Sequence, residues 1–152
     1  MRTFTSGEQL STAVGEHLGT SEWLEISQDR INAFADATGD HQWIHVDVAR
    51  AATESPYGAP IAHGFLSLSL VSMLNWQIYT VDHTRLALNY GTNKVRFISP
   101  VTVGARVRLH STLTSVTNVD SDAVQVVVTS LLEIAGEPKP ALVADLIGRY
   151  IF

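Results

Sequence analysis

The first part of the chain carries its hydrophobic residues at the spacing of α-helices. Ser27 is a favourable N-cap, and Asp29 places negative charge in the turn that follows it. Gly39 ends the pattern, because glycine readily adopts the left-handed conformation of a helix C-cap. We therefore predict a helix from Ser27 to Gly39, preceded by a short strand within residues 23–26. The positions that define its periodicity are Ile31, Phe34, Ala35 and Thr38.

Residues 40–60 show no regular period, apart from a short helix expected over residues 47–52. An irregular connector of this length in a compact domain is usually functional. The longest apolar segment follows at residues 62–79, where large hydrophobic side chains occupy most of a helical wheel. A helix that is apolar on nearly every side is enclosed by the rest of the fold. This one would be roughly 27 Å long at 1.5 Å per residue.

The second half of the chain changes to alternating and β-branched runs, which are typical of strands. Short turns separate the runs, so we predict antiparallel strands joined as a meander. Helices followed by a run of strands predict an α+β fold, with the long helix lying against a curled sheet. No repeat or flexible linker divides the chain, and we expect one domain over residues 1–152. The predicted strands are 86–90, 94–98, 105–116, 123–134 and 142–151.

The composition narrows the possible chemistry. Of the 152 residues, 45% are hydrophobic and 16% are charged, a balance that excludes a disordered chain. The formal net charge of -5 argues against general binding to nucleic acid or to an anionic membrane. No apolar run reaches the ~20 residues of a membrane span, and no secretory signal begins the chain, so we expect a soluble, cytoplasmic protein.

The chain contains no cysteine. Disulfides, thiolate metal sites and cysteine nucleophiles are therefore excluded together. Motifs for dinucleotide binding, for a P-loop and for an α/β-hydrolase nucleophile are also missing from the sequence. The remaining chemistry must use oxygen and nitrogen groups.

Asp40 and His45 are the first candidates for that chemistry. They lie five residues apart, directly after the glycine that ends the predicted helix, so on a loop both can converge on one water molecule. Imidazole is the side chain best suited to taking and returning protons at neutral pH. Three other interpretations stay open: Asp40 as a turn or helix cap, His45 as a partner of a main-chain carbonyl, and a metal site. The metal site would use His41 and His45 with Asp47 or His63.

Gly64 is the second candidate, at the beginning of the long apolar helix. The first turn of a helix has unpaired N–H groups and a partial positive charge, which suit a developing oxyanion. Glycine there lets a ligand carbonyl approach the main chain, although it equally permits close packing. The preceding His63 is by itself more typical of a packed or capping residue than of a catalyst.

Basic residues alternate along two of the predicted strands. Lys94 and Arg96 share one face of their strand, and Arg106 and Arg108 share a face of the next. Together they would form a local cationic edge able to receive phosphate groups on an otherwise acidic protein. Solvated strand faces produce the same pattern.

The motifs taken together resemble the MaoC-like, (R)-specific enoyl-CoA hydratases. The resemblance rests first on the run from Thr38 to His45, with its Gly-Asp step followed by an aliphatic residue and histidine. Ala-His-Gly-Phe at residues 62–65 and the strand at residues 90–97 are also similar to that family. One difference is that Gln42 and Trp43 replace the usual Asn-Pro of the motif, which removes a rigid turn.

This resemblance implies a hot-dog fold, in which an antiparallel sheet wraps a central helix, and a homodimer with thioesters bound near the subunit interface. It implies that Asp40 and His45 are the catalytic pair and that the main-chain N–H of Gly64 is the oxyanion donor. Neither metal nor redox cofactor is required. The expected reaction is hydration of a trans-2-enoyl-CoA to the (R)-3-hydroxyacyl-CoA.

The substrate contacts expected from the resemblance are less specific than the catalytic pair. Gln42, His63, Lys94 and Arg96 are the candidates for substrate binding. The CoA phosphates would be received by Lys94, Arg96, Arg106 or Arg108, or by the equivalent residues of a partner subunit. Two other functions stay open: an acyl-CoA thioesterase of the hot-dog fold, and a non-catalytic subunit of a heteromeric dehydratase.

Overall fold

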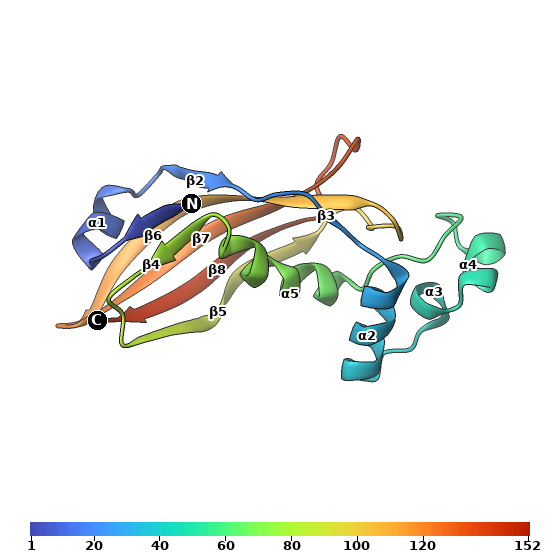
Figure 1. The fold of residues 1–152 in the computed structure, drawn as a ribbon, viewed down its shortest axis with the longest axis horizontal. Coiled ribbons are helices and arrows are strands. Elements are labelled where there is room, and N and C mark those ends of the chain that lie inside the picture. The colour runs from blue at the N-terminus through green and yellow to red at the C-terminus, as the bar shows by residue number, and fades with distance from the viewer.

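The computed structural model describes all residues, 1–152. Its centre is a six-stranded antiparallel sheet in the order β2-β6-β7-β8-β5, with β3 pairing to β6 at the edge occupied by β2. The α+β hot-dog architecture is confirmed, since α5 lies across one face of this sheet (Figure 1). The strands are β2 (His17–Thr20), β3 (Leu24–Glu25), β5 (Leu86–Phe97), β6 (Arg106–Asp120), β7 (Ala123–Ile134) and β8 (Leu142–Ile151).

The meander prediction is correct for β6, β7 and β8 and wrong for β5. Strand β5 pairs with β8 instead of β6 and so forms the opposite edge of the sheet. The connection from β5 to β6 crosses beneath the beginning of α5, where Ala62 N–H donates to the carbonyl of Val101 (2.7 Å). The two runs predicted at 86–90 and 94–98 form one strand, because register shifts at residues 89–91 and 92–94 accommodate the polar segment between them.

Helix α5 (Gly64–Asn75) is shorter than the predicted segment 62–79. At 1.5 Å per residue it spans roughly 18 Å. Residues 79–81 instead form β4 (Tyr79–Val81), which pairs in parallel with β1 (Arg2–Phe4). Only one side of α5 is enclosed: Phe65 and Trp76 are 67% and 66% exposed. The prediction of an enclosed helix is wrong for a single chain, because the sheet covers one side only. The side chains buried against the sheet include Leu66, Leu70, Val71 and Leu74.

Three helices form an excursion beyond the sheet, at the end where α5 begins (Figure 1). They are α2 (Gln28–Thr38), α3 (Trp43–Val46) and α4 (Val48–Glu54). Helix α2 has the predicted limits: Ser27 accepts from Arg30 N–H (3.3 Å), and Gly39 is left-handed (φ 77°). Helix α4 corresponds to the predicted 47–52 helix, whereas α3 was not predicted. The excursion places residues 40–63 beside the beginning of α5.

The N-terminal elements were not predicted, since they are short. Strand β1 is followed by α1 (Gly7–Thr12), whose buried Leu10 joins the core. The main core cluster contains 25 buried residues, drawn from α1, α2, α5 and the inner face of the sheet. No helix of the protein is both long and apolar enough to cross a membrane.

Candidate active site

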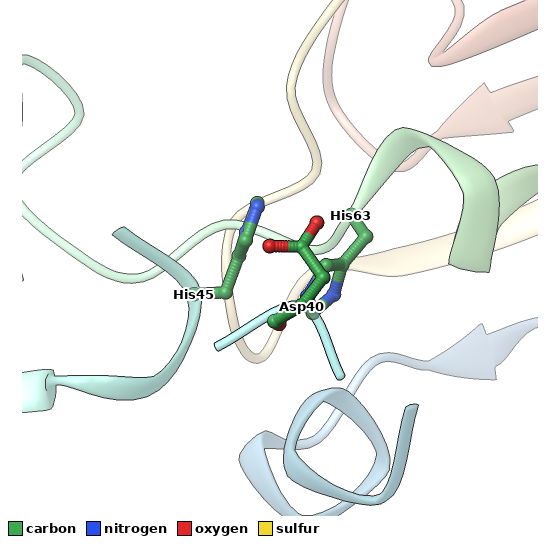
Figure 2. Close-up of side chains that lie close together, drawn as sticks. All are labelled: Asp40, His45 and His63. Atoms are coloured by element: carbon green, nitrogen blue, oxygen red, sulfur yellow. The ribbon is translucent and has the colours of Figure 1, made fainter. Parts of the chain in front are cut away.

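Three polar side chains from separate parts of the chain meet where α5 begins. Asp40 follows the left-handed Gly39 at the end of α2, His45 lies in α3, and His63 immediately precedes α5. One oxygen or ring nitrogen of each lies within 4.8 Å of those of the others. Figure 2 shows the three side chains gathered beside the first turn of α5. The structure therefore brings Asp40 and His45 together, as the spacing predicts for a loop.

His45 is buried, with 8% of its surface exposed. Its Nδ1 lies 2.7 Å from the carbonyl oxygen of Ile61, and because a carbonyl can only accept, Nδ1 carries the hydrogen. Nε2 therefore holds the lone pair, and it has no hydrogen-bond partner in the protein. Burial lowers the pKa of His45 below its ordinary value of 6.5 and outweighs the bond to Ile61, which acts in the opposite direction. His45 is thus a neutral imidazole with a free basic nitrogen at pH 7.

The carboxylate of Asp40 is exposed and makes no ion pair. Its Oδ1 accepts from the main-chain N–H of Gln42 over a long 3.4 Å. The carboxylate therefore has capacity left to bind a water molecule or ligand. Gln42 is also exposed, and it precedes α3 without a capping bond from its side chain. The side-chain amide of Gln42 is thus exposed and makes no capping bond to the helix that follows it.

His63 is 3% exposed and packs within the cluster. Its ring stacks on that of His45, with centroids 3.8 Å apart and an interplanar angle of 28°. Nε2 of His63 donates to the main-chain carbonyl of Asp40 (2.9 Å). Nδ1 is buried and has no hydrogen-bond partner. His63 therefore contacts both Asp40 and His45 from beneath.

A metal site on this cluster is not favoured by its geometry. Lone pairs of an imidazole lie in the ring plane, so two stacked, nearly parallel rings direct them side by side and not at a common ion. The helical pair of His41 and His45 is not formed either. The ring of His41 is exposed and bonds to Asp36 (2.9 Å), while Asp47 accepts from Arg50 N–H (3.0 Å) as the N-cap of α4.

Gly64 is the first residue of α5, and its N–H has no acceptor within the protein. No side chain caps this end of the helix, so the N–H groups of the first turn remain available to an anion. The close-packing interpretation also holds, because a Cβ at position 64 would lie 3.1 Å from the ring of Phe97. Glycine therefore serves packing on one side while its N–H stays free.

The basic residues of β5 lie away from the cluster. Lys94 pairs in register with Asp145 and Arg96 with Val143, on the face of the sheet opposite to α5. Val95, between them, packs against the core. Within one chain, Lys94 and Arg96 therefore extend from the face of the sheet that is turned away from Asp40 and His45.

A family model described as a MaoC-like domain matches residues 9–135, which is most of the chain. The chain belongs to the MaoC-like dehydratase family. The predicted enzyme class, a hydro-lyase, is confirmed with it. The resemblance on which the sequence prediction rested is thus correct.

Relatives of this MaoC-like chain match most or nearly all of its length. The 3-hydroxyacyl-thioester dehydratase Z of Mycobacterium tuberculosis is 52% identical over 151 residues, which cover 99% of each chain. The (R)-hydratase of A. caviae involved in PHA biosynthesis has a TM-score of 0.70 and 25% identity, covering 89% of this chain and 94% of its own. A monoamine oxidase regulatory protein from Archaeoglobus fulgius has a TM-score of 0.81 and 23% identity, covering 99% and 96%, and shows the fold alone.

Gln28 is a part of the MaoC-like site that sequence reasoning missed. Its Nε2 donates to the main-chain carbonyl of His45 (2.8 Å) and to Oδ1 of Asn32 (2.9 Å), which ties α3 to the first turn of α2. The sequence offers no signal for this contact, since glutamine in a first helical turn is ordinary. The carbonyl of Ile61, which orients the ring of His45, is equally invisible in a sequence because every residue has one.

Arg108, one of the basic residues expected to receive phosphate groups, is already paired with an acidic side chain. Its guanidinium makes two bonds to the carboxylate of Glu133 (2.6 and 3.2 Å), and that carboxylate also bonds to His110 (2.6 Å). These bonds lower the pKa of Glu133, with that from Arg108 the largest cause. The guanidinium of Arg108 is therefore already paired, whereas a side chain that binds phosphate is expected to be free.

We expect Arg108→Ala to leave the KM for an enoyl-CoA within about two-fold of the parent value. The half-exposed ion pair should contribute less than about 1 kcal/mol to the free energy of unfolding, so the loss of stability should also be small. Initial rates measure the KM, and urea denaturation measures the free energy of unfolding. Arg96→Ala is the matched comparison, and a larger rise in KM for Arg108→Ala than for Arg96→Ala would contradict this assignment.

Proposed function

We propose that this MaoC-like enzyme adds water to trans-2-enoyl-CoA and forms (R)-3-hydroxyacyl-CoA. The observation that carries the proposal is a neutral His45 with a free Nε2, clustered with the Asp40 carboxylate and with His63, which directly precedes the unpaired N–H of Gly64. The relatives support the same chemistry, since one is named a 3-hydroxyacyl-thioester dehydratase and another an (R)-hydratase.

His45 and Asp40 act on the water in this mechanism. Nε2 of His45 takes a proton from the water as its oxygen bonds to Cβ of the substrate. Asp40 orients the water and helps to pass the proton taken by His45 on to Cα, so that the OH and H of one water molecule are added across the double bond and His45 returns to its neutral form. The hydrogen bond from Nδ1 to Ile61 fixes the His45 ring in the tautomer that this step requires.

Gly64 stabilises the charge that develops during addition. Bonding at Cβ shifts electron density to the thioester oxygen, which becomes enolate-like. An oxygen at the beginning of α5 would receive the N–H of Gly64 and the positive end of the helix dipole. No covalent enzyme intermediate is needed, because the water attacks Cβ of the substrate directly.

The direct experiment is an assay of enoyl-CoA substrates of several chain lengths, followed by the loss of enoyl absorbance. A thiol-reactive dye in the same assay detects free CoA, which only a thioesterase would release. Hydration without thiol release supports the proposal. Thiol release without hydration would favour the thioesterase alternative, and inactivity toward every chain length would favour a non-catalytic subunit.

A homodimer is part of the proposal. Strand β5 forms an edge of the sheet over 12 residues, and nearly all of them are exposed. A long edge with exposed apolar side chains is a ready surface for pairing with another chain. The uncovered side of α5 adds Phe65, Met73 and Trp76 beside it. The exposed apolar side chains of β5 are Leu86, Leu88, Tyr90 and Phe97. A second copy of the chain would cover both the edge strand β5 and the uncovered side of α5.

The pH dependence of the reaction should follow His45. Because burial lowers its pKa below 6.5, the neutral, basic form persists to lower pH than in a free histidine. We expect kcat/KM to be level near pH 7 and to fall about ten-fold per pH unit on the acid side, with its midpoint below 6.5. Initial rates measured between about pH 4.5 and 8 give the midpoint of this profile. A midpoint above 6.5 would contradict the role assigned to His45.

A further inference from the structure

The contacts of His63 bear on how the site is held together. The sequence suggests substrate binding for this residue, yet its ring is enclosed by protein. Phe34 packs against it with ring centroids 5.0 Å apart, and His45 stacks on it at 3.8 Å. With 3% of the residue exposed, His63 offers no surface to an acyl-CoA.

Each part of the site touches His63. Its Nε2 donates to the carbonyl of Asp40, so it holds the main chain that carries the carboxylate. Its ring supports that of His45, and its own position is the N-cap of α5, directly before Gly64. One side chain therefore joins the proposed base, the carboxylate and the oxyanion donor, which come from three different segments of the chain.

We propose that His63 is a positioning residue, which fixes the Asp40 main chain and the plane of the His45 ring relative to the first turn of α5. The proposal rests on the proposed function. Displacing a catalytic group by about 1 Å can cost as much as a hundred-fold in rate, so a rigid support under both groups has a large effect without touching substrate.

A second consequence concerns the charge of His45. Two stacked imidazoles repel one another if both are protonated, so His63 opposes protonation of its neighbour. The groups acting on the His45 ring are the carbonyl of Ile61, the ring of His63 and the carboxylate of Asp40, besides burial itself. His41 and Asp36 are paired with each other on the exposed surface. Loss of the His63 imidazole should therefore raise the pKa of His45.

Two variants separate these effects. His63→Phe keeps the stacked ring and the burial but removes the hydrogen bond to Asp40 and the titratable nitrogens. His63→Gln places an amide donor near the position of Nε2 and removes the ring. NMR titration of the His45 ring, assigned by its loss in His45→Gln, reports its pKa without requiring turnover. Melting temperatures identify any variant that fails to fold.

We expect the pKa of His45 to rise in both variants, and kcat to fall between roughly ten- and a hundred-fold in His63→Phe with little change in KM. His63→Gln should recover part of kcat. An unchanged His45 titration together with an unchanged kcat would overturn the proposal, and a rise in KM alone would restore the substrate-binding interpretation. If the parent enzyme itself shows no hydration, the proposed function fails while the NMR result still decides the role of His63.

A separate observation concerns a cavity at the other end of α5. It has a volume of about 200 Å³ and lies between the last turns of the helix and strands β4, β5, β7 and β8. Its walls are mostly apolar and include Leu88, Val126, Val128 and Leu146. Ser72, which lines it, is about 12 Å beyond Gly64 along the helix at 1.5 Å per residue, a distance that a medium or long acyl chain spans.

Hydrogen-bond donors are left over in this cavity. The hydroxyls of Tyr79 and Tyr150 lie 3.3 Å apart, so one donates to the other and the second O–H has no acceptor in the protein. Burial raises the pKa of both phenols, and the shift is larger for Tyr79, so both remain protonated. Oδ1 of Asn75 accepts from Ser111 (2.6 Å), which leaves the amide NH2 as a donor. Asn75, Tyr79 and Tyr150 all line the cavity, so a ligand there can accept a hydrogen bond from the spare phenol proton or from the Asn75 amide.

We infer that the cavity takes acyl chains that carry an accepting oxygen, a hydroxyl or a ketone, away from the thioester. This inference also rests on the proposed function. Such an oxygen would accept from the spare phenol proton or from the Asn75 amide, while the methylene groups around it contact the valine and leucine walls. An unsubstituted chain would leave both donors without partners.

The test compares two trans-2-enoyl-CoA substrates of equal length, one ending in a methyl group and one in a hydroxymethyl group. The ratio of their kcat/KM values should shift at least about five-fold toward the unsubstituted chain in Tyr79→Phe/Tyr150→Phe, relative to the parent enzyme. Thermal stabilisation by 1,8-octanediol relative to 1-octanol gives the same comparison without turnover. Unchanged ratios in both measurements would overturn the inference, whereas absence of turnover with a changed stabilisation ratio would count against the proposed function only.

Discussion

Asp40→Asn and His45→Gln should each lower the rate of enoyl-CoA hydration by about two to four orders of magnitude. Asparagine keeps the shape of the Asp40 side chain but removes its charge, and glutamine removes the basic Nε2 that the bond to Ile61 leaves free. Since neither change deletes a buried apolar group, the fold should persist. Initial rates with the best enoyl-CoA substrate, together with melting temperatures, measure the effect.

His41→Gln is the matched control. His41 is one residue from Asp40, but its ring is exposed and bonded to Asp36 on the surface. The rate of this variant should remain within about two-fold of the parent rate. Equal losses in His41→Gln and His45→Gln, or full activity in Asp40→Asn, would contradict the assignment of the catalytic pair.

The second large effect is expected at the proposed subunit contact. Leu86 and Tyr90 lie on the exposed edge strand β5, and they are 45% and 53% exposed. Leu86→Lys/Tyr90→Lys places two positive charges where a second copy would pack, and like charges facing each other across a symmetric interface repel strongly. Light scattering should show the mass falling from twice 16.6 kDa to a single 16.6 kDa.

Val119→Lys is the control for that variant. Val119 is an exposed apolar residue of similar accessibility, 41%, at the far end of β6 near the turn into β7. It should leave the mass of the dimer unchanged. A parent protein that is already monomeric at micromolar concentration would contradict the proposed homodimer, as would a double-lysine variant that keeps the mass of the parent.

Capping preferences and hydrophobic alternation, which are local in the sequence, were sufficient to predict the limits of some elements of the fold. The limits of α2 follow from the capping preferences of Ser27 and Gly39, and the limits of β7 and β8 follow from alternation between clear turns. The position of β5 at the edge beside β8 depends on a non-local crossing beneath α5, which no local pattern encodes. The end of α5 depends on pairing between β4 and β1, which are 77 residues apart in register, from Arg2 to Tyr79.

The site shows the same division between local and non-local information. Asp40 and His45 are recognisable from their spacing and from the glycine before them. At the position of the usual proline, Trp43 begins α3, a place that suits proline as well, and its ring packs against the guanidinium of Arg50 at 4.3 Å. Nothing in the structure explains the choice of Gln42. The supporting contacts from Gln28 and Ile61 could not be predicted, since they join segments through ordinary amide and carbonyl groups.

Hydration by Asp40 and His45 is tested most directly by analysing the product that forms from trans-2-enoyl-CoA in water enriched in heavy oxygen. Chiral chromatography with mass spectrometry identifies the configuration of the 3-hydroxyacyl-CoA and the position of the label. We predict the (R) product with the heavy oxygen at C3, its formation abolished in Asp40→Asn/His45→Gln. Label in a released carboxylic acid, an (S) product, or an unchanged yield from the double variant would contradict the account.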